Sequence, residues 1–327
     1  MPKIVSLALK SILLALLVLS LASCDSDLEP VPQEIPDYLS LTYREAGITE
    51  TVGHSYGSHE QMTFDLYEVE RNPDKERPLV IVSPESNGVR YGGIDALKGL
   101  CKDLAKRGYV VALVYNRLMP FGSSFEDNLT FWFSFVHDQK AAVRFFKKNA
   151  AKYRISEDKV FINGYAFGAV ATLMTSHMEL KDLEEMTEGK DEFMAVYGEI
   201  GLEGTENLGV SSTVKGVSMM TTFISDINII DANGPAMMFI HNEHSTLSDG
   251  TKMMGKYLYS NDIYEINLYG PDLITAHSIE KGYKKGDDLE FILMDEWLDV
   301  ADYSPVVSTL TSDNWEEIAS FYHQNLD

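Results

Sequence analysis

Residues 159–177 read KVFINGYAFGAVATLMTSH, and this stretch decides the fold. It opens with a short apolar run at 160–162 and passes through two glycines. It then continues into apolar side chains at helical spacing, namely Val170, Leu173 and Met174. An apolar run, a glycine-rich break and a helical period in this order predict a strand, a sharp turn and a helix.

The turn is centred on Ala166, with Gly164 and Gly168 two residues to either side. A nucleophile elbow has this arrangement, because its central residue is held in a strained conformation and side chains at the flanking positions would clash across the turn. The central residue of a working elbow is a nucleophile such as serine, whereas the methyl group of Ala166 cannot attack a carbonyl carbon. The sequence therefore predicts a hydrolase scaffold that lacks its nucleophile.

The segments before this turn alternate between strand and helix patterns. Residues 78–82 are apolar, as expected of a buried parallel strand, and 109–115 repeat that pattern. Residues 62–69 alternate loosely in the manner of an edge strand. Between the two apolar strands, one helical face carries Leu97, Leu100, Cys101, Leu104 and Ala105. This rhythm predicts a parallel sheet with crossover helices.

The chain begins with a predicted lipoprotein leader. Residues 1–23 carry two lysines, a short apolar stretch and Leu-Ala-Ser directly before Cys24. This pattern is typical of a secretory signal peptide, and the cysteine after the small residues resembles a bacterial lipobox. We therefore expect Cys24 to be lipidated and to hold the protein at the bacterial cell envelope, facing the periplasm or the exterior. A secreted protein with a chance cysteine is the alternative.

Charge and cysteine content limit the remaining functions. The formal net charge of −23 becomes −25 when the two lysines of the leader are removed. Such an acidic balance disfavours nucleic acid as a partner and direct docking on anionic lipid. Cys24 and Cys101 are the only cysteines of the sequence, so no internal disulfide framework is expected in the mature chain. No cofactor is expected.

The mature chain is predicted to form one main domain, residues 41–303. A flexible acidic tether, residues 24–40, precedes it and contains three prolines. Residues 179–210 form a predicted cap-like acidic insertion, for which a solvated acidic helix is the simplest interpretation. Residues 304–327 are predicted to be a helical tail that docks on its own domain.

Several segments around the elbow resemble one enzyme family. The helix pattern at 138–146, the Asn-Ala-Ala-Lys-Tyr stretch at 149–153, and the strand and elbow after them are similar to the esterase and lipase branch of the α/β-hydrolases, the carboxylesterase and feruloyl-esterase-like group. Later segments at 202–204, 214–217 and 235–241 are similar to that family in the same order. The resemblance extends over roughly residues 60–300, and it implies a doubly wound, mostly parallel sheet in an α/β-hydrolase fold.

The resemblance also implies positions for the nucleophile and for the oxyanion-binding N–H groups. Ala166 stands at the serine position. Where the family carries His-Gly-Gly, this chain has Ser83, Pro84 and Glu85. Pro84 offers no N–H, and Glu85 would place a negative charge close to a developing oxyanion. The backbone N–H of Phe167 is the one oxyanion donor that remains.

The acid and the base of the triad are implied in the same way. Ser245 stands where the family has the aspartate that orients its histidine, and His277 falls at the position of the histidine itself. His277 is therefore a remnant base, or a surface or packing histidine. An engineered serine-to-alanine change would have left the acid and the oxyanion loop intact, so the combined losses favour a natural pseudo-hydrolase.

Two segments rich in histidine suggest a metal site as an alternative. His241, Glu243 and His244 could join His277 in binding a divalent ion, because both segments end strands that the resemblance places side by side. Within a strand, however, His241 and Glu243 point to one face and His244 to the other. We therefore expect no metal.

Taken together, the residues favour a pseudo-hydrolase that binds a small ester or glycan-derived ligand in a pocket lined by Tyr165, Phe167 and His277. An active carboxylic-ester hydrolase is the main alternative. It would need a displaced nucleophile or a displaced acid, for which the candidates are Ser83, Ser86, Glu243 and Asp249. A purely structural or interaction module is the third possibility, and such a module would lack the pocket. Protein partners and the exact ligand are not predicted.

Overall fold

The computed structural model describes residues 37–70, 72, 74–84, 94–117, 125–179, 181–182, 190–198, 200–220, 227–230, 232, 234–242, 253–259, 262–268, 271–294 and 312–326. The predicted leader with Cys24, most of the tether, Glu85 and Ser245 lie outside these residues. In the described part of the chain, no helix combines the length and the apolar character that crossing a membrane requires.

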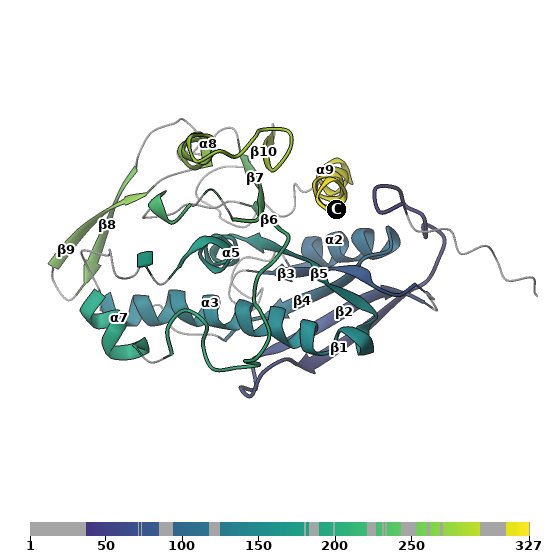
Figure 1. Cartoon of the computed structure of the whole chain (residues 1–327), viewed down its shortest axis with the longest axis horizontal. Coiled ribbons are helices and arrows are strands. Elements are labelled where there is room, and N and C mark those ends of the chain that lie inside the picture. Colours follow the sequence, from purple (N-terminus) through teal and green to yellow (C-terminus); the bar gives the residue numbers. More distant parts are fainter. Residues whose placement is uncertain are drawn as a thin grey trace, which may run out of the picture. The chain divides into compact units, whose positions relative to one another are not determined.

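An eight-stranded sheet forms the centre of the fold, in the spatial order β1-β2-β4-β3-β5-β6-β7-β10 (Figure 1). β1 is antiparallel to β2 and β2 to β4, whereas all later neighbours run parallel. The predicted mostly parallel sheet is thereby confirmed. The strands are β1 (Ile48–Ser55), β2 (Thr63–Val69), β3 (Arg77–Ser83), β4 (Val110–Tyr115), β5 (Ile155–Tyr165), β6 (Gly216–Met220), β7 (Ala236–Asn242) and β10 (Leu289–Met294).

Helices cover both faces of this sheet, as a doubly wound fold requires. α3 (Phe125–Lys148) and α5 (Phe167–His177) pack on one face, and α2 (Ile94–Lys106) and α9 (Ser312–Gln324) pack on the other. The remaining elements are α4 (Ala150–Tyr153), α7 (Lys190–Tyr197), the 3-10 helix η2 (Ile227–Ile229), α8 (Pro271–Glu280) and the antiparallel pair β8 (Met253–Tyr259) and β9 (Asp262–Leu268).

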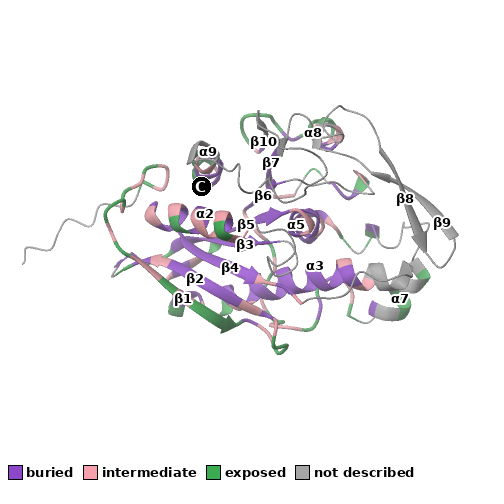
Figure 2. Cartoon of the chain, turned by 180° about the vertical axis from the view of Figure 1, so that it is seen from behind, coloured by how far each residue is buried: buried purple, intermediate pink, exposed green. Residues whose placement is uncertain are grey.

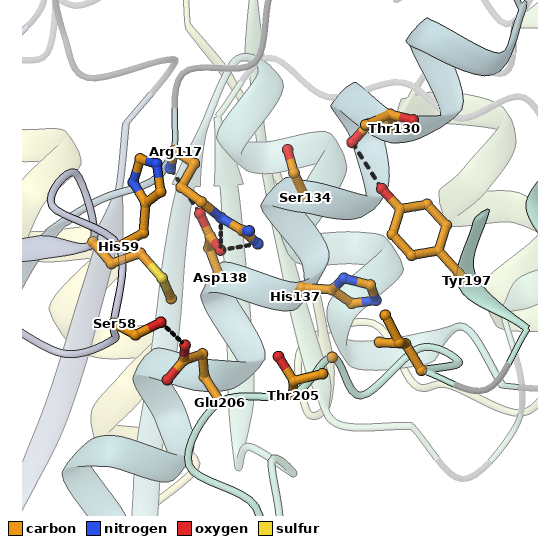
Figure 3. A pocket seen from close by; sticks show the side chains of 13 residues that line it. Ser58, His59, Arg117, Thr130, Ser134, His137, Asp138, Tyr197, Thr205 and Glu206 are labelled. Carbon is orange, nitrogen blue, oxygen red and sulfur yellow. Dashed lines mark hydrogen bonds and ion pairs between the residues drawn. The ribbon is translucent and has the colours of Figure 1, made fainter.

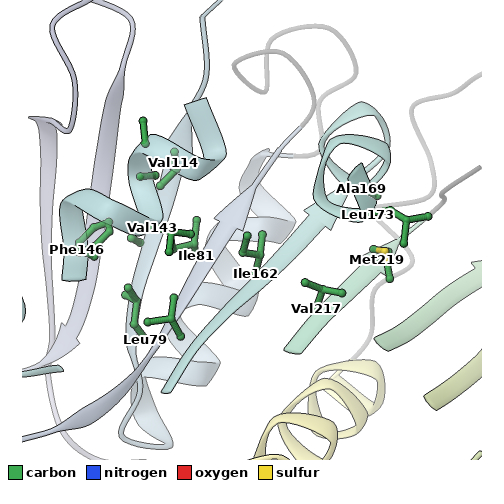
Figure 4. Close-up of a cluster of buried hydrophobic side chains, with 14 of the residues drawn as sticks. Leu79, Ile81, Val114, Val143, Phe146, Ile162, Ala169, Leu173, Val217 and Met219 are labelled. Atoms are coloured by element: carbon green, nitrogen blue, oxygen red, sulfur yellow. The ribbon is translucent and has the colours of Figure 1, made fainter. Parts of the chain in front are cut away.

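The apolar run of β3 is explained by burial on both faces. Leu79 and Ile81 belong to the cluster under α3 and α5, part of which Figure 4 shows, whereas Val80 and Val82 face α2. Successive side chains of a strand alternate between faces, so a central strand needs apolar residues at every position. All four side chains are fully buried, and each contributes about 1.5–3 kcal/mol relative to an exposed position.

The prediction of β2 as an edge strand is wrong. β2 lies between β1 and β4, and five of its seven residues are buried. The true edge is β1, whose residues are mostly exposed, as Figure 2 shows. β1 carries few apolar side chains, so its sequence has no periodic signal of a strand. When β1 is not recognised, β2 takes the place of the edge strand.

The C-terminal helix α9 docks on its own domain. The ring of Tyr322 lies 4.8 Å from that of Phe161 on β5, and its hydroxyl lies 2.6 Å from Ser218 Oγ on β6. Near the start of α9, the Trp315 ring packs so closely on α2 that a methyl group at Gly99 would lie 3.0 Å from it. The last helix of the chain thereby completes the core on the α2 face.

Candidate functional site

The predicted elbow is present at the carboxyl end of β5. β5 ends at Tyr165, α5 begins at Phe167, and Ala166 between them has φ 50° and ψ −118°. A side chain other than glycine is strained in this region, at a cost of about 1–3 kcal/mol. Ala166 therefore keeps the backbone conformation that presents a nucleophile, although it has no reactive atom.

Both flanking glycines are required by close backbone contacts. A Cβ atom at Gly164 would lie 2.6 Å from the Cα of Ala169 in α5. A Cβ atom at Gly168 would lie 2.3 Å from the carbonyl oxygen of Ser83 and 2.9 Å from that of Pro84. The first turn of α5 therefore sits directly against the end of β3, the segment that the resemblance implies for oxyanion binding.

A buried polar network lies beneath this contact. Ser83 Oγ accepts hydrogen bonds from Asn116 Nδ2 at 3.1 Å and from Gln139 Nε2 at 2.9 Å. Gln139 Nε2 also lies 3.0 Å from the Gly168 carbonyl oxygen, which accepts a bond from the Thr172 hydroxyl at 2.7 Å. These side chains tie β3, β4, α3 and α5 together under the elbow. Gln139 stands between Asp138 and Lys140 in the sequence, so nothing local marks it as a member of this network.

Of the two described segments that the resemblance implies for oxyanion binding, one offers a backbone N–H group and the other contains a proline. Phe167 is the first residue of α5, where N–H groups have no partner within the helix. Pro84 follows β3 as a buried residue and contributes no N–H. Glu85, the third position of this predicted loop, lies outside the described residues.

Aromatic side chains form a wall beside the elbow. The Phe167 ring meets those of Phe131 and Trp132 on α3 edge to face, with centroids 5.5 and 5.2 Å apart. Phe167 and Trp132 are partly exposed, whereas Phe131 is buried. This wall offers an apolar surface next to Ala166.

Tyr165 does not line such a surface. Its side chain is 5 % exposed and belongs to the apolar cluster on the α2 face of the sheet. Because β5 alternates, Tyr165 faces the opposite side of the sheet from its neighbour Gly164, which packs against α5. The expectation that Tyr165 contributes to a ligand pocket is therefore not supported by its place in the core.

The structure places His277 on α8, in the last turn of that helix. The ring is mostly buried, and Nδ1 lies 4.0 Å from Glu280 Oε2. Its predicted pairing with the elbow stays a prediction, and so does the acid position Ser245, which lies outside the described residues.

The premise of the metal alternative is wrong. The strand before His277, β9, pairs with β8 in a separate sheet, whereas β7 with His241 is flanked by β6 and β10. The two histidine segments therefore do not end neighbouring strands. Among the described side chains, no group of three or more His, Cys, Asp or Glu lies together in a way that could hold a metal ion.

A pocket of about 390 Å³ lies on another face of α3, and sequence reasoning missed it (Figure 3). None of the predicted site residues lines it. It is built from α3, the end of α7, the segment after β4 and two loops, so its residues share no local pattern. The lining residues are Ser58, His59, Met62, Arg117, Thr130, Ser134, His137, Asp138, Tyr197, Ile200, Gly204, Thr205 and Glu206.

An ion cluster fastens one of these loops to α3. The carboxylate of Glu203 accepts hydrogen bonds from Lys140 Nζ at 2.6 Å and from Arg144 Nη1 at 2.6 Å. Ser212 Oγ donates to the same carboxylate at 2.9 Å. The Arg144 side chain is only 1 % exposed, so its charge depends on this partner. Burial acts to raise the pKa of Glu203, but the hydrogen bond and charge of Lys140, with Ser212 and Arg144, hold that pKa below its ordinary value.

Removing this carboxylate is expected to destabilise the fold. Glu203→Gln leaves two buried cations without their counter-charge; because the Glu203 side chain is 51 % exposed and solvent screens part of its charge, we expect the free energy of unfolding to fall by about 1 kcal/mol. Because the folded-state pKa is lowered, the stabilisation is present above about pH 5 and is lost as the pH falls through the folded-state pKa. Urea unfolding at pH 7 and pH 4 measures both effects. The exposed Glu317→Gln is the matched control, and an equal response of the two variants would contradict the prediction.

Comparisons with known proteins agree with this geometry. The BD-FAE family model matches residues 64–249, more than half of the 327 residues. Thermogutta terrifontis esterase 2 phosphorylated by paraoxon is similar in structure with a TM-score of 0.52 at 14 % identity, covering 84 % of this chain and 95 % of that one. No curated protein shows a significant match.

Two further structures are similar to this chain. A truncated carbohydrate esterase from gut microbiota has a TM-score of 0.55 at 13 % identity, with 85 % of this chain and 97 % of that chain covered. A bifunctional GH43-CE protein of Bacteroides eggerthii has a TM-score of 0.58 at 16 % identity, covering 85 % of this chain and 35 % of that one. At these identities the likeness establishes the fold alone.

Proposed function

The chain belongs to the BD-FAE family of α/β-hydrolase-type esterase domains, and on that premise we propose that it is a non-catalytic member that binds a small ester or glycan-derived ligand at the elbow. The observation that carries the proposal is Ala166, which holds the strained conformation of a nucleophile position without a nucleophile. The carbohydrate esterase among the similar structures supports the glycan-derived class of ligand.

The surroundings of the elbow support the loss of catalysis. The nearby hydroxyl of Ser83, one candidate for a displaced nucleophile, is fully buried and accepts hydrogen bonds from two amide groups. An amide cannot take up the proton that a nucleophilic serine must lose. The aromatic wall of Phe167 and Trp132 keeps an apolar surface on which an acyl or aromatic group can pack.

The proposal predicts no esterase turnover. Loss of the nucleophile alone removes about a millionfold of the rate in a serine hydrolase, so hydrolysis of p-nitrophenyl acetate by purified residues 25–327 should equal the buffer rate. Turnover that disappears in His277→Ala would refute the proposal and would direct attention to Ser86. Binding is measured separately as quenching of tryptophan fluorescence by methyl ferulate, with Trp132→Phe expected to remove most of the signal.

We also propose that the protein is a lipoprotein of the bacterial cell envelope, facing the periplasm or the exterior, anchored through Cys24. The Leu-Ala-Ser-Cys sequence after an apolar leader supports this. Cys24→Ser should release the protein into the soluble fraction or block its processing. Metabolic labelling with radioactive palmitate and membrane fractionation measure the effect. Retention of both the label and the membrane association in the variant would show that another feature anchors the chain.

A further inference from the structure

The pocket beside α3 is separate from the elbow. Thr130, Ser134 and His137 line the pocket at helical spacing, whereas Phe131 and Trp132 face Phe167 at the elbow. The two sets occupy different faces of one helix. A ligand in this pocket therefore does not depend on the function proposed for the elbow.

The floor of the pocket is buried and polar. Ser134 is 4 % exposed, His137 is 7 % exposed and Asp138 is fully buried. The rim is open, because Ser58, His59, Ile200 and Thr205 are exposed. A volume of about 390 Å³ lies in the range of small-molecule sites, and the labelled polar side chains surround it in Figure 3.

The hydrogen-bond donors of Ser134 and His137 on this floor are bonded to backbone carbonyl oxygens of the protein. The Ser134 hydroxyl donates to the Phe131 carbonyl oxygen at 2.7 Å. His137 Nε2 lies 2.8 Å from the Gly201 carbonyl oxygen, which can only accept, so Nε2 carries the hydrogen and Nδ1 is the acceptor nitrogen of the ring. A serine oxygen that donates its hydrogen still accepts through its lone pairs. The floor therefore offers acceptors to a ligand that brings donors.

The ionisation of His137 agrees with this assignment. Burial lowers the pKa of His137, and the nearby positive charges of Arg117, Lys140 and Arg144 lower it further, against the opposite effect of the Gly201 hydrogen bond. The imidazole is therefore neutral at neutral pH and keeps its acceptor nitrogen.

The charged side chains that line the pocket favour neither a cationic nor an anionic ligand. Arg117 binds Asp138 through its backbone N–H at 2.7 Å and through its guanidinium at 2.7 and 2.8 Å, so the two charges compensate each other. A ligand cation would gain little from the lining carboxylates, because Asp138 is already paired with Arg117 and Glu206 already accepts the Ser58 hydroxyl. A ligand anion would meet an acceptor floor and the carboxylate of Glu206, which already accepts the Ser58 hydroxyl at the rim.

We propose that this pocket binds a neutral polyhydroxylated ligand, of the size of one or two sugar rings. Hydroxyl groups supply the donors that Ser134 and His137 accept, and they also accept from the hydroxyl groups of Thr130 and Thr205 in the wall. The ring of Tyr197, held by a hydrogen bond to the Thr130 carbonyl oxygen, provides an apolar face for the carbon skeleton.

Saturation-transfer NMR on the whole mature protein tests the proposal. The neutral probes are methyl glycosides of glucose, galactose, mannose, xylose and arabinose at millimolar concentration. Glucosamine and glucuronic acid serve as the cationic and the anionic analogue of glucose. We expect transfer to at least one neutral glycoside and weaker transfer to both charged sugars. Transfer to none of the neutral glycosides, or stronger transfer to a charged sugar, overturns the proposal.

Four variants locate the ligand. Thr205→Trp places an indole in the mouth of the pocket and should weaken binding at least tenfold, whereas Ser211→Trp, on an exposed residue of the same segment, should not. Ser134→Ala removes one acceptor and should weaken binding about fivefold. Phe167→Ala, at the elbow, should leave the loss of binding caused by Thr205→Trp unchanged. Loss of binding in Phe167→Ala with retention in Thr205→Trp would place the sugar at the elbow and refute the second site.

Discussion

Ala166→Ser is expected to remain almost without esterase activity, although it restores the missing nucleophile. The turn already holds position 166 in the conformation of an elbow, so the serine should point where a substrate carbonyl would lie. A missing oxyanion donor costs about 10²- to 10³-fold in rate, and a missing orienting acid costs about 10⁴-fold in a well-studied triad. The single variant should therefore hydrolyse p-nitrophenyl acetate at the background rate and react only slowly with a fluorophosphonate probe.

A fuller reversion provides the positive control. Ala166→Ser combined with Ser245→Asp, Pro84→Gly and Glu85→Gly should give measurable turnover, and adding His277→Ala should remove it again. Robust hydrolysis by Ala166→Ser alone would show that a working acid and oxyanion hole persist. Glu243 or Asp249 would then be the first acids to test. In that outcome the protein is an esterase disabled at one residue.

Gly168→Ala is expected to have the largest effect on stability among single substitutions at the elbow. The new methyl group would lie 2.3 Å from the Ser83 carbonyl oxygen, a backbone atom that cannot rotate away. Relief requires α5 to move from the end of β3, which also strains the bonds between Gln139 and Ser83 and between Gln139 and Gly168. We expect a loss of at least about 3 kcal/mol in the free energy of unfolding.

Gly53→Ala is the matched control for this substitution. Gly53 has a φ of +72° and open space around its Cβ position, so only the backbone cost of about 1–2 kcal/mol applies. Chemical denaturation of both variants gives the comparison. If Gly168→Ala loses no more than Gly53→Ala, the close approach of α5 to β3 is wrong.

The parts of the fold with local signals could be predicted from the sequence. The strand, turn and helix around Ala166 follow from two glycines and an apolar period, and their spacing reflects the close contacts that the structure contains. β1 could not be predicted, because an exposed edge strand needs no apolar period. β2 was consequently assigned to the edge.

The site was less predictable than the fold, because its parts are distant in the sequence. Ser83, Asn116 and Gln139 meet only when the ends of β3 and β4 converge on the interior of α3. The pocket beside α3 joins residues 58 and 206, and nothing in either segment signals the other. The place of Tyr165 differs from the expectation for a simpler reason: the strand alternation turns its side chain into the core on the α2 face.

The docking of α9 has a consequence for how the chain acquires its structure. α9 follows β5 and β6 in the sequence, yet it covers Phe161 on the central strand β5 and bonds Ser218 on β6. A growing chain therefore leaves this face of the sheet open until residues 312–324 have left the ribosome, and a chaperone can hold it during that time. Late closure suits the export that we propose, because a polypeptide that cannot finish folding before α9 is made can still pass unfolded through a secretion channel. The synthesis of α9 thus determines when the domain can finish folding.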